Sequence, residues 1–399
     1  MAGFIRYMKI LFLYDFPLWG SGSGTYLRNL VKELVRLNHK IGIVAPDNRR
    51  FLDDKIKQYQ VKSPIIPVFL GHPELKGAKR YSELSDREIT TIFKAFLDTT
   101  LEAVENFQPD IIHVQHLSMI AWVARYIKAL KRIPYVITTH GSCLSNLTNN
   151  KKYIPLTEDA IRHAKALTTV SGNTRSRFLK MFGKNYAKDF NIIPGGVDMR
   201  LFSKKPNIER INKKYKLKDK KVVLFCGRLT SEKGARYLIG AAKDIKGEVV
   251  IVGEGPERKF LEQTIKTKGL KNVQLVGYMP HEEIIDFYFR ADVFVAPSVV
   301  EEALGLSILE AMAAKSPVIA TRKGGIPLLV KHNHNGLFVR ARNAQKIAEA
   351  CNKILDNDEL RKKMGENARE TVEEKFTWKQ SGVKFDRFYK KYGNGKNHK

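Results

Sequence analysis

Three absences narrow what this chain of 399 residues can be. It has only three cysteines, far apart in sequence, which offer neither metal-ligand spacing nor a disulfide framework and suit a reducing cytosol. It has no run of 18 apolar residues, so no transmembrane helix is predicted. Its apolar start is interrupted by Lys9 and Asp15 and lacks a small-residue cleavage site, so we interpret it as a first β-strand rather than a signal peptide.

Acidic residues are scarce relative to basic ones. The chain carries 70 Lys and Arg against 41 Asp and Glu, a formal net charge of +29 that is spread over both halves. A nucleic acid, an anionic membrane surface and a phosphate-bearing substrate would each suit such a charge. Charge alone does not choose among the three.

The order of apolar runs predicts an α/β fold. Short apolar runs alternate with longer amphipathic ones, which indicates parallel sheets with crossover helices. The length predicts two domains, which we place at 1–203 and 204–376, because residues 203–220 are rich in Lys and Asn and poor in apolar side chains. The amphipathic segment 377–392 is expected to pack back onto the first domain, and the tail 393–399 to be disordered.

The stretch 297–325, PSVVEEALGLSILEAMAAKSPVIATRKGG, holds two carboxylates, Glu302 and Glu310. Glu302 lies on a loop above the carboxyl end of a predicted strand, where open α/β sheets bind ligands. Gly305 precedes a predicted helix, whose first amides can bind a phosphate. Glu310, within that helix, could accept hydrogen bonds from the two hydroxyls of a ribose. The same residues also fit an ordinary strand–loop–helix with two solvated glutamates.

A glycine-rich segment follows the first predicted strand. Gly22, Ser23 and Gly24 stand before a helix predicted to open at Thr25, and such a loop lets the backbone approach a phosphate closely. The spacing G-x-G-x-G differs from the dinucleotide fingerprint, although Asp47 stands where a ribose-binding acid would lie. A dinucleotide fold and a plain flexible turn both remain open.

Three further side chains follow predicted strands. Arg228 and Lys233, in the segment GRLTSEKG, could converge on a pyrophosphate, although a solvated basic turn is the alternative. His140 ends a strand and is followed by a glycine that leaves room for a ligand. A lone histidine at a strand end is more often structural, but we rank His140 above the two histidines of the segment DIIHVQH because of this glycine.

Taken together, these stretches resemble the retaining glycosyltransferases of the large family 4, which have the GT-B fold. The resemblance extends over nearly the whole chain in the right order, through GSGT, TTHG, TVS, IPGGVD, GRLTSEKG, VGEGP, the 297–325 stretch, NGLFV and FTWKQ. It implies two Rossmann-like domains that face each other across a cleft. It also implies a nucleotide-sugar donor mainly on the C-terminal domain and an acceptor mainly on the N-terminal one.

The resemblance implies roles for individual residues. Glu310 would hold the ribose hydroxyls, and Glu302 would lie near the transferred sugar. Arg228 and Lys233 would grip the diphosphate. The other matches are the donor-binding backbone at Gly22, Ser23, Gly24, Gly305, Leu306 and Ser307, and His140 near the sugar and acceptor.

The predicted activity is therefore retaining, metal-independent transfer of a sugar from a UDP- or GDP-linked donor to an acceptor hydroxyl, without a cofactor. No second carboxylate is positioned to act as a covalent nucleophile, so the paired-acid scheme of glycosidases is not expected. A non-hydrolysing nucleotide-sugar epimerase is an alternative with a similar architecture. A charge-driven nucleic-acid binder is a weaker one, because it leaves the two glutamates unexplained.

A basic strip, Lys76, Lys79 and Arg80, precedes a helix of the N-terminal half. We interpret it as attraction to an anionic bilayer, with a lipid or lipid-linked glycan as the acceptor. The enzyme would then be cytoplasmic and peripheral on the inner face of the membrane. A solvated loop in a very basic protein is the alternative.

Overall fold

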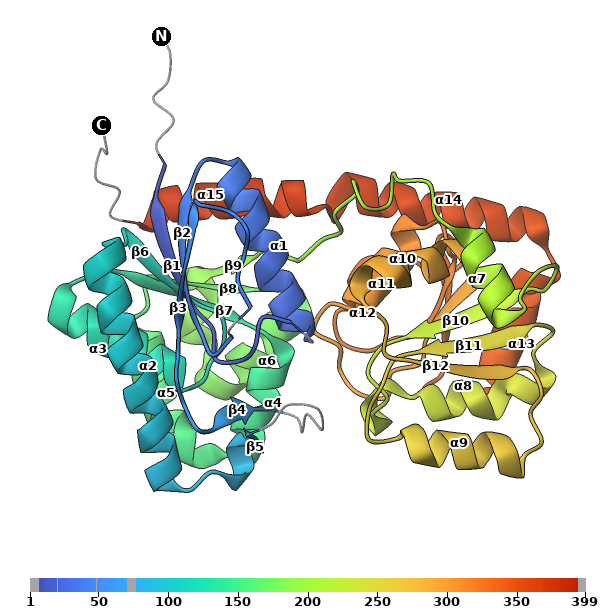
Figure 1. The fold of residues 1–399 in the computed structure, drawn as a ribbon, viewed down its shortest axis with the longest axis horizontal. Helices are drawn as coiled ribbons and strands as arrows, with labels where there is room; N and C mark the ends of the chain where they lie inside the picture. The colour runs from blue at the N-terminus through green and yellow to red at the C-terminus, as the bar shows by residue number, and fades with distance from the viewer. Residues whose placement is uncertain (1–6, 20, 48, 70–76, 394–399) are drawn as a thin grey trace, which may run out of the picture. The chain divides into compact units, whose positions relative to one another are not determined.

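The structure is a computed structural model that describes residues 7–19, 21–47, 49–69 and 77–393. The chain divides into two compact units (Figure 1). Unit 1 comprises Met1–Gly195 together with Trp378–Lys399, and unit 2 comprises Gly196–Thr377. None of the helices in the described ranges is both long enough and apolar enough to cross a membrane.

Unit 1 is built on a seven-stranded parallel sheet with the order β3-β2-β1-β6-β7-β8-β9. Its central strands are almost wholly apolar and buried, as expected where helices cover both faces. The strands are β1 Lys9–Leu13, β2 Lys40–Ala45, β3 Ile56–Gln60, β6 Ile111–Val114, β7 Tyr135–Thr139, β8 Ala166–Thr169 and β9 Phe190–Ile192. A separate short pair consists of β4 Ile66–Val68 and β5 Ala78–Arg80.

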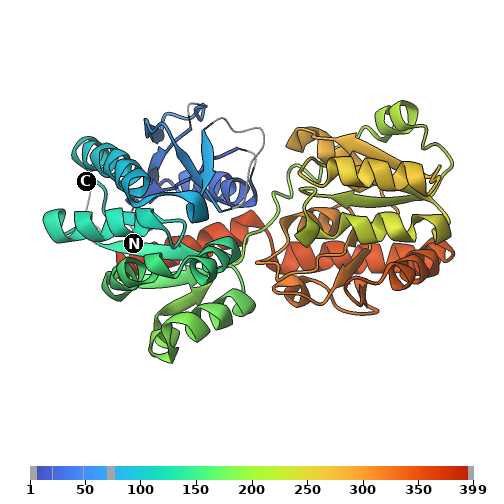
Figure 2. The same cartoon turned by 90° about the horizontal axis from the view of Figure 1, so that it is seen from below.

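The helices of unit 1 lie on both faces of this sheet, which Figure 2 shows from below. α1 (Gly22–Arg36) and α15 (Trp378–Tyr392) pack together on one face. α2 (Asp86–Phe107), α3 (Met119–Lys131) and α5 (Ile154–His163) pack in a row on the other. The shorter α4 (Gly141–Asn149) and α6 (Gly172–Phe182) follow β7 and β8.

The C-terminal segment packs back onto unit 1, as the sequence predicts. The Trp378 ring lies 5.0 Å from the Tyr26 ring, and Ser381 donates a hydrogen bond of 2.7 Å to the Pro194 carbonyl. At the centre of the sheet, the Tyr389 hydroxyl lies 2.6 Å from Nδ1 of His113. α15 therefore completes the core of unit 1. Of the tail expected to be disordered, only Gly393 belongs to the described residues.

Unit 2 is built on a six-stranded parallel sheet with the order β12-β11-β10-β13-β14-β15. Counted along the unit this is 3-2-1-4-5-6, which places the topological switch point between β10 and β13. The strands are β10 Val222–Cys226, β11 Glu248–Val252, β12 Val273–Gly277, β13 Val293–Ala296, β14 Val318–Thr321 and β15 Gly336–Val339.

Helices again cover both faces (Figure 1). α8 (Ala235–Ala241), α9 (Arg258–Thr267) and α13 (Ala344–Leu355) bury their apolar sides in one core against the sheet. α10 (His281–Arg290), α11 (Leu306–Ala313) and α14 (Asp358–Lys375) lie over the other face, and the short α12 (Ile326–Leu329) follows β14.

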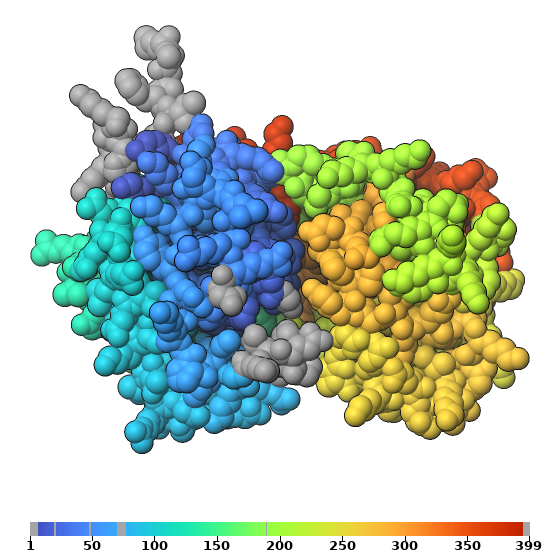
Figure 3. Space-filling model, viewed as in Figure 1, coloured from blue at the N-terminus to red at the C-terminus, as the bar shows by residue number. Residues whose placement is uncertain are grey.

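The expected linker of residues 203–220 is wrong in part, because it contains the helix α7 (Ile208–Tyr215). This helix is short, and of its apolar side chains Ile208, Ile211 and Tyr215, which are spaced three and four residues apart, only Ile211 is buried. Ion pairs add to its hold on α10, because Arg210 reaches Glu283 at 2.7 Å and Asp286 at 3.1 Å. Figure 3 shows α7, in lime, beside the orange segment of α10 on the surface of unit 2.

The compact units divide at Gly195, earlier than the division expected at residue 203. The cause is backbone pairing just after this point. The Val197 amide donates a hydrogen bond of 2.8 Å to the Phe376 carbonyl, and Val197 forms a parallel bridge with Thr377. The entering and leaving segments of unit 2 therefore lie side by side.

Candidate functional site

Three loops interlock at the switch point of unit 2. They follow β10, β13 and β14. The Val299 amide donates to the Glu232 carbonyl at 2.8 Å, and the Gly325 amide donates to the Glu302 carbonyl at 2.7 Å. Gly324 has φ +58, and a Cβ there would lie 2.0 Å from the Glu302 carbonyl oxygen. Only glycine allows this approach, so the Gly-Gly turn fixes the backbone of Glu302.

A second close approach supports the loop after β10. A Cβ on Gly253, which has φ +141, would lie 1.9 Å from the Gly227 carbonyl oxygen. Beside it, the Leu229 amide donates to the Glu254 carbonyl at 2.8 Å. The segment VGEGP thus acts as a backbone platform for the turn that carries Arg228 and Lys233.

Lys233 and Glu302 meet on this platform. Lys233 Nζ lies 2.6 Å from Oε1 of Glu302, and the Ser298 hydroxyl donates to the same oxygen at 2.6 Å. Burial opposes ionisation of Glu302, but Lys233 and Ser298 outweigh it and hold the pKa of this carboxyl below its usual value. The side chain of Glu302 is 15% exposed and that of Lys233 is 38% exposed, so the ammonium faces solvent while it neutralises the glutamate.

Arg228 lies on the same turn in a half-buried position. Burial lowers the pKa of its guanidinium, and the neighbouring charge of Glu232 partly restores it. A guanidinium keeps its charge under these conditions. The turn therefore supplies two cations, one of which is paired with Glu302.

Helix α11 begins directly after this loop. Its N-cap is Gly305, which has φ +96 and no side chain to accept from the first amides. The amides of Ile308 and Leu309 bond to the Gly305 carbonyl, which leaves those of Leu306 and Ser307 at the positive end of the helix dipole. The predicted anion-binding backbone at Leu306 and Ser307 therefore follows Glu302 on the same loop, and Glu302 in turn contacts Lys233.

Glu310 belongs to a different group of side chains. Its Oε1 lies 2.7 Å from Nε2 of His281, and its Oε2 accepts a hydrogen bond of 2.9 Å from the Tyr288 hydroxyl. Sequence reasoning missed both partners, and it also missed Ser298 beside Glu302. A signal was present for each: Ser298 stands four residues before Glu302, and His281 and Tyr288 stand seven apart in sequence, which is two helical turns on α10.

The glycine segment of unit 1 is not a loop ahead of a helix. Gly22, Ser23 and Gly24 are the first residues of α1, so the predicted helix start at Thr25 is wrong. The reason is the N-cap Ser21, whose hydroxyl accepts a hydrogen bond of 3.0 Å from the Gly24 amide, so that the helix begins at Gly22. Asp47 does not support the dinucleotide interpretation, because its two carboxylate oxygens already accept hydrogen bonds from the backbone amides of Leu18 and Arg49.

His140 caps α4 and is buried. Its ring lies 5.1 Å from the Tyr26 ring of α1 and 4.9 Å from the His116 ring, and its Nε2 is 3.3 Å from Oε1 of Gln115. Burial, together with His116, holds the pKa of His140 well below its usual value. The side chain is therefore neutral at pH 7.

His140 belongs to a buried polar cluster at the carboxyl ends of β1, β6 and β7. Asp15 Oδ2 accepts from Ser118 at 2.6 Å and from Tyr81 at 2.9 Å. Within the described residues, Asp15 Oδ1 and both ring nitrogens of His116 have no hydrogen-bond partner. Burial raises the pKa of Asp15 to about 6, against the effect of its two donors, and lowers that of His116 to about 3.

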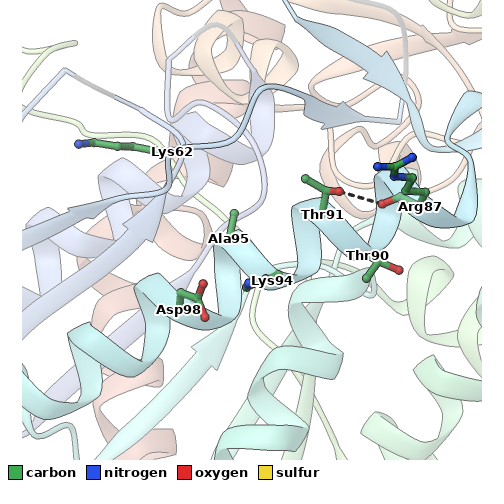
Figure 4. A pocket seen from close by; sticks show the side chains of 7 residues that line it. All are labelled: Lys62, Arg87, Thr90, Thr91, Lys94, Ala95 and Asp98. Atoms are coloured by element: carbon green, nitrogen blue, oxygen red, sulfur yellow. Dashed lines mark hydrogen bonds between the residues drawn. The ribbon is translucent and has the colours of Figure 1, made fainter.

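The basic strip of unit 1 is already neutralised where it is described. Lys79 lies on β5 with Nζ 2.8 Å and 2.9 Å from the two oxygens of Glu88, and Arg80 lies 3.8 Å from Glu83. Lys76 lies outside the described residues. A separate shallow pocket with several basic side chains lies along α2 (Figure 4). It is lined by Lys62, Arg87, Thr90, Thr91, Lys94, Ala95 and Asp98.

Across the ranges that the structure describes, no three His, Cys, Asp or Glu side chains come together in a group that could hold a metal ion. The charged groups at the switch point of unit 2 are organic cations and carboxylates.

Two Rossmann-like units, each a parallel sheet with helices on both faces, are the architecture of the GT-B fold. The chain belongs to the family 4 glycosyltransferases. Residues 20–201 match the family described as Glycosyltransferase Family 4, and residues 207–371 match Glycosyl transferases group 1.

The relatives extend over almost the full chain. An uncharacterized glycosyltransferase of Methanocaldococcus jannaschii is 31% identical over 90% of this chain and 91% of its own length. A GDP-mannose-dependent alpha-(1-6)-phosphatidylinositol monomannoside mannosyltransferase of Mycolicibacterium smegmatis is 28% identical over 94% and 96%. The structure of Anabaena HepE in complex with UDP-glucose matches with a TM-score of 0.78 at 19% identity, over 96% of this chain and all of that one.

Proposed function

We propose that this glycosyltransferase moves a sugar from a nucleoside diphosphate to an acceptor hydroxyl with retention at the anomeric carbon. One observation carries the proposal: Lys233, Glu302 and Ser298 form a preorganised charged group at the switch point of unit 2. Ligands bind at this place in open α/β sheets. The ammonium would meet the diphosphate, and the ionised Glu302 would accept from a sugar hydroxyl.

The proposed chemistry breaks the bond between the anomeric carbon and the phosphate oxygen and forms one to the acceptor oxygen on the same face. The acceptor proton passes to the departing phosphate oxygen. Lys233, Arg228 and the amides of Leu306 and Ser307 stabilise the negative charge that develops on the diphosphate. This charge compensation needs no metal, which we propose for this enzyme. His140 of unit 1 is buried and neutral, so it would not exchange a proton in this reaction.

The donor base follows from a thermal-shift panel of UDP, GDP and ADP and their sugars with the full chain. A ligand that binds only the folded state raises its melting temperature, by an amount that grows with concentration over Kd. The named relatives direct attention to GDP-mannose and UDP-glucose as the first two donors. A shift with one base, followed by transfer to an acceptor, supports the proposal. Interconversion of the nucleotide sugar without an acceptor would support the epimerase instead.

We also propose a lipid-linked acceptor and peripheral contact with the inner face of the membrane. Support comes from the lipid named for the mycobacterial relative, from the cations Arg87 and Lys94 on α2, and from Lys62, which lines the same pocket from another segment. Flotation with anionic and neutral vesicles tests this. Replacing Arg87 and Lys94 with Gln should reduce binding to anionic vesicles, whereas Lys79→Gln should not, because Glu88 already neutralises Lys79. Equal binding to both vesicle types would contradict the proposal.

A further inference from the structure

Both oxygens of Glu310 are held by one helix. His281 and Tyr288 lie seven residues apart on α10, so their side chains project from the same face two turns apart. His281 reaches Oε1 at 2.7 Å and Tyr288 reaches Oε2 at 2.9 Å. A carboxylate gripped at both ends cannot rotate about its last bond, so the plane of this group is fixed.

The grip from Tyr288 is rigid. Its side chain is buried, and burial, with Cys226 and Glu310 nearby, holds the pKa of its hydroxyl well above the usual value. The hydroxyl therefore stays protonated and donates to Glu310. The backbone of Tyr288 is also fixed, because the Ser316 hydroxyl donates to its carbonyl at 2.8 Å.

The remaining acceptor capacity of Glu310 points to a particular ligand group. A carboxylate has about four lone-pair positions, and the two contacts from α10 use one on each oxygen. One position therefore remains on each of two oxygens in a fixed plane. Two neighbouring hydroxyls on one ring supply two O–H donors that such a pair can accept at once. The carboxylate is 15% exposed and the His281 side chain 33%, so the open side of the group is reachable.

We propose that His281 and Tyr288 are positioning residues that hold the Glu310 carboxylate in the orientation required by the cis-diol of the donor ribose. This inference rests on the proposed function, because it requires a nucleotide ligand. A free glutamate would have to be ordered when the ligand binds, and a preordered one does not. The two residues then contribute to affinity only through ligands that carry the diol.

The experiment measures Kd by calorimetry for the nucleoside diphosphate selected by the thermal panel and for its 2′,3′-dideoxy analogue. His281→Ala and Tyr288→Phe should each weaken binding of the diol ligand by about tenfold. Both should change the affinity for the dideoxy analogue by less than about twofold. His281→Gln should largely restore diol binding, because its side-chain amide can donate from nearly the same position as Nε2.

Two controls separate this role from a structural one. His334→Ala removes an exposed histidine of the same unit and should leave both affinities unchanged. Circular dichroism and the melting temperature show whether each variant is folded. If Tyr288→Phe does not fold, the comparison of His281→Ala with His281→Gln tests the inference.

Three outcomes overturn the inference. Equal losses for the diol and dideoxy ligands would assign His281 and Tyr288 to stability alone. Unchanged affinity in folded variants would mean that Glu310 needs no positioning. Either result leaves the proposed function intact if the wild-type protein binds nucleotide. A wild-type protein that binds no nucleoside diphosphate overturns the proposed function and this inference together.

Discussion

The two units use the same sheet order around their switch points, yet the side chains gathered there differ in kind. In unit 2 they are charged and partly exposed, and Lys233 neutralises Glu302. In unit 1 they are buried, and His116 and His140 are held neutral. The topology is therefore shared, whereas the loop residues decide whether the side chains gathered at the switch point are partly exposed ions or a buried cluster.

The comparison is tested most strongly at Glu302. Glu302→Gln should lower kcat by about 10²–10³-fold, because the amide neither neutralises Lys233 nor offers a charged acceptor to the sugar. Steady-state transfer assays measure this loss. Glu301→Gln, an exposed neighbour on the same loop, is the control and should stay within about twofold. Activity of Glu302→Gln above a tenth of wild type would contradict the assignment.

The next largest effect is expected at the turn that supports Glu302. Gly324→Ala should destabilise unit 2 by more than about 2 kcal/mol, because its Cβ would collide with the Glu302 carbonyl at a positive φ. Gly269→Ala is the matched control, since it has φ +61 and nothing within 4 Å of a Cβ, and should cost about 1 kcal/mol. Thermal unfolding compares the two, and equal costs would show that only backbone strain matters.

Asp15, the buried carboxyl of unit 1, has its pKa raised, whereas the pKa of Glu302 in unit 2 is lowered. Its raised pKa of about 6 means that Asp15 favours folding below pH 4 and opposes it as pH rises through 6. Asp15→Asn keeps an acceptor for Ser118 and Tyr81 without a charge. It should stabilise unit 1 by about 3 kcal/mol at pH 8 and by almost nothing at pH 4. Denaturant unfolding followed by tryptophan fluorescence reports this unit, because Trp19, Trp122 and Trp378 all lie in it.

The smallest expected effect concerns the acid stability of unit 1. Below about pH 6.5 a buried neutral histidine takes up a proton when the protein unfolds. Each such histidine therefore lowers the free energy of unfolding by about 1.4 kcal/mol for every pH unit that the pH falls. His116→Phe should remove one such contribution without loss of a hydrogen bond, because neither ring nitrogen of His116 has a hydrogen-bond partner among the described residues. A Phe ring can also keep the stacking on Phe69, whose ring lies 5.1 Å away. The same fluorescence assay from pH 7 to 5 should show a shallower decline. An unchanged slope would mean that His116 is already charged in the folded protein.

The main architecture was predictable because it depends on local patterns. Short apolar runs alternating with amphipathic ones predicted parallel sheets with crossover helices, and strands such as Ile111–Val114 and Gly336–Val339 are short runs of this kind. The strand-end loops then indicated where charged residues would gather, and Lys233 and Glu302 do meet. The roles of the site residues remain predictions.

Other features depend on contacts that sequence spacing does not encode. α7 is a short helix that is held on α10 by the ion pairs of Arg210 and by the contact of Tyr215 with Phe287, which join segments far apart in sequence. The start of α1 is decided by the Ser21 cap rather than by glycine content. The contact between His281 and Glu310 joins side chains on two helices whose relative rotation is fixed by packing. Only the folded chain shows these.

The path of the chain makes unit 2 an insertion within unit 1. Its two connections lie side by side at the Val197–Thr377 bridge, so unit 2 is one continuous piece of sequence with neighbouring ends. Unit 1 is discontinuous, and Tyr389 reaches His113 only from the last helix. During synthesis, unit 2 can therefore fold as soon as it emerges from the ribosome, whereas the earlier-made part of unit 1 must wait until α15 has been made to close its core.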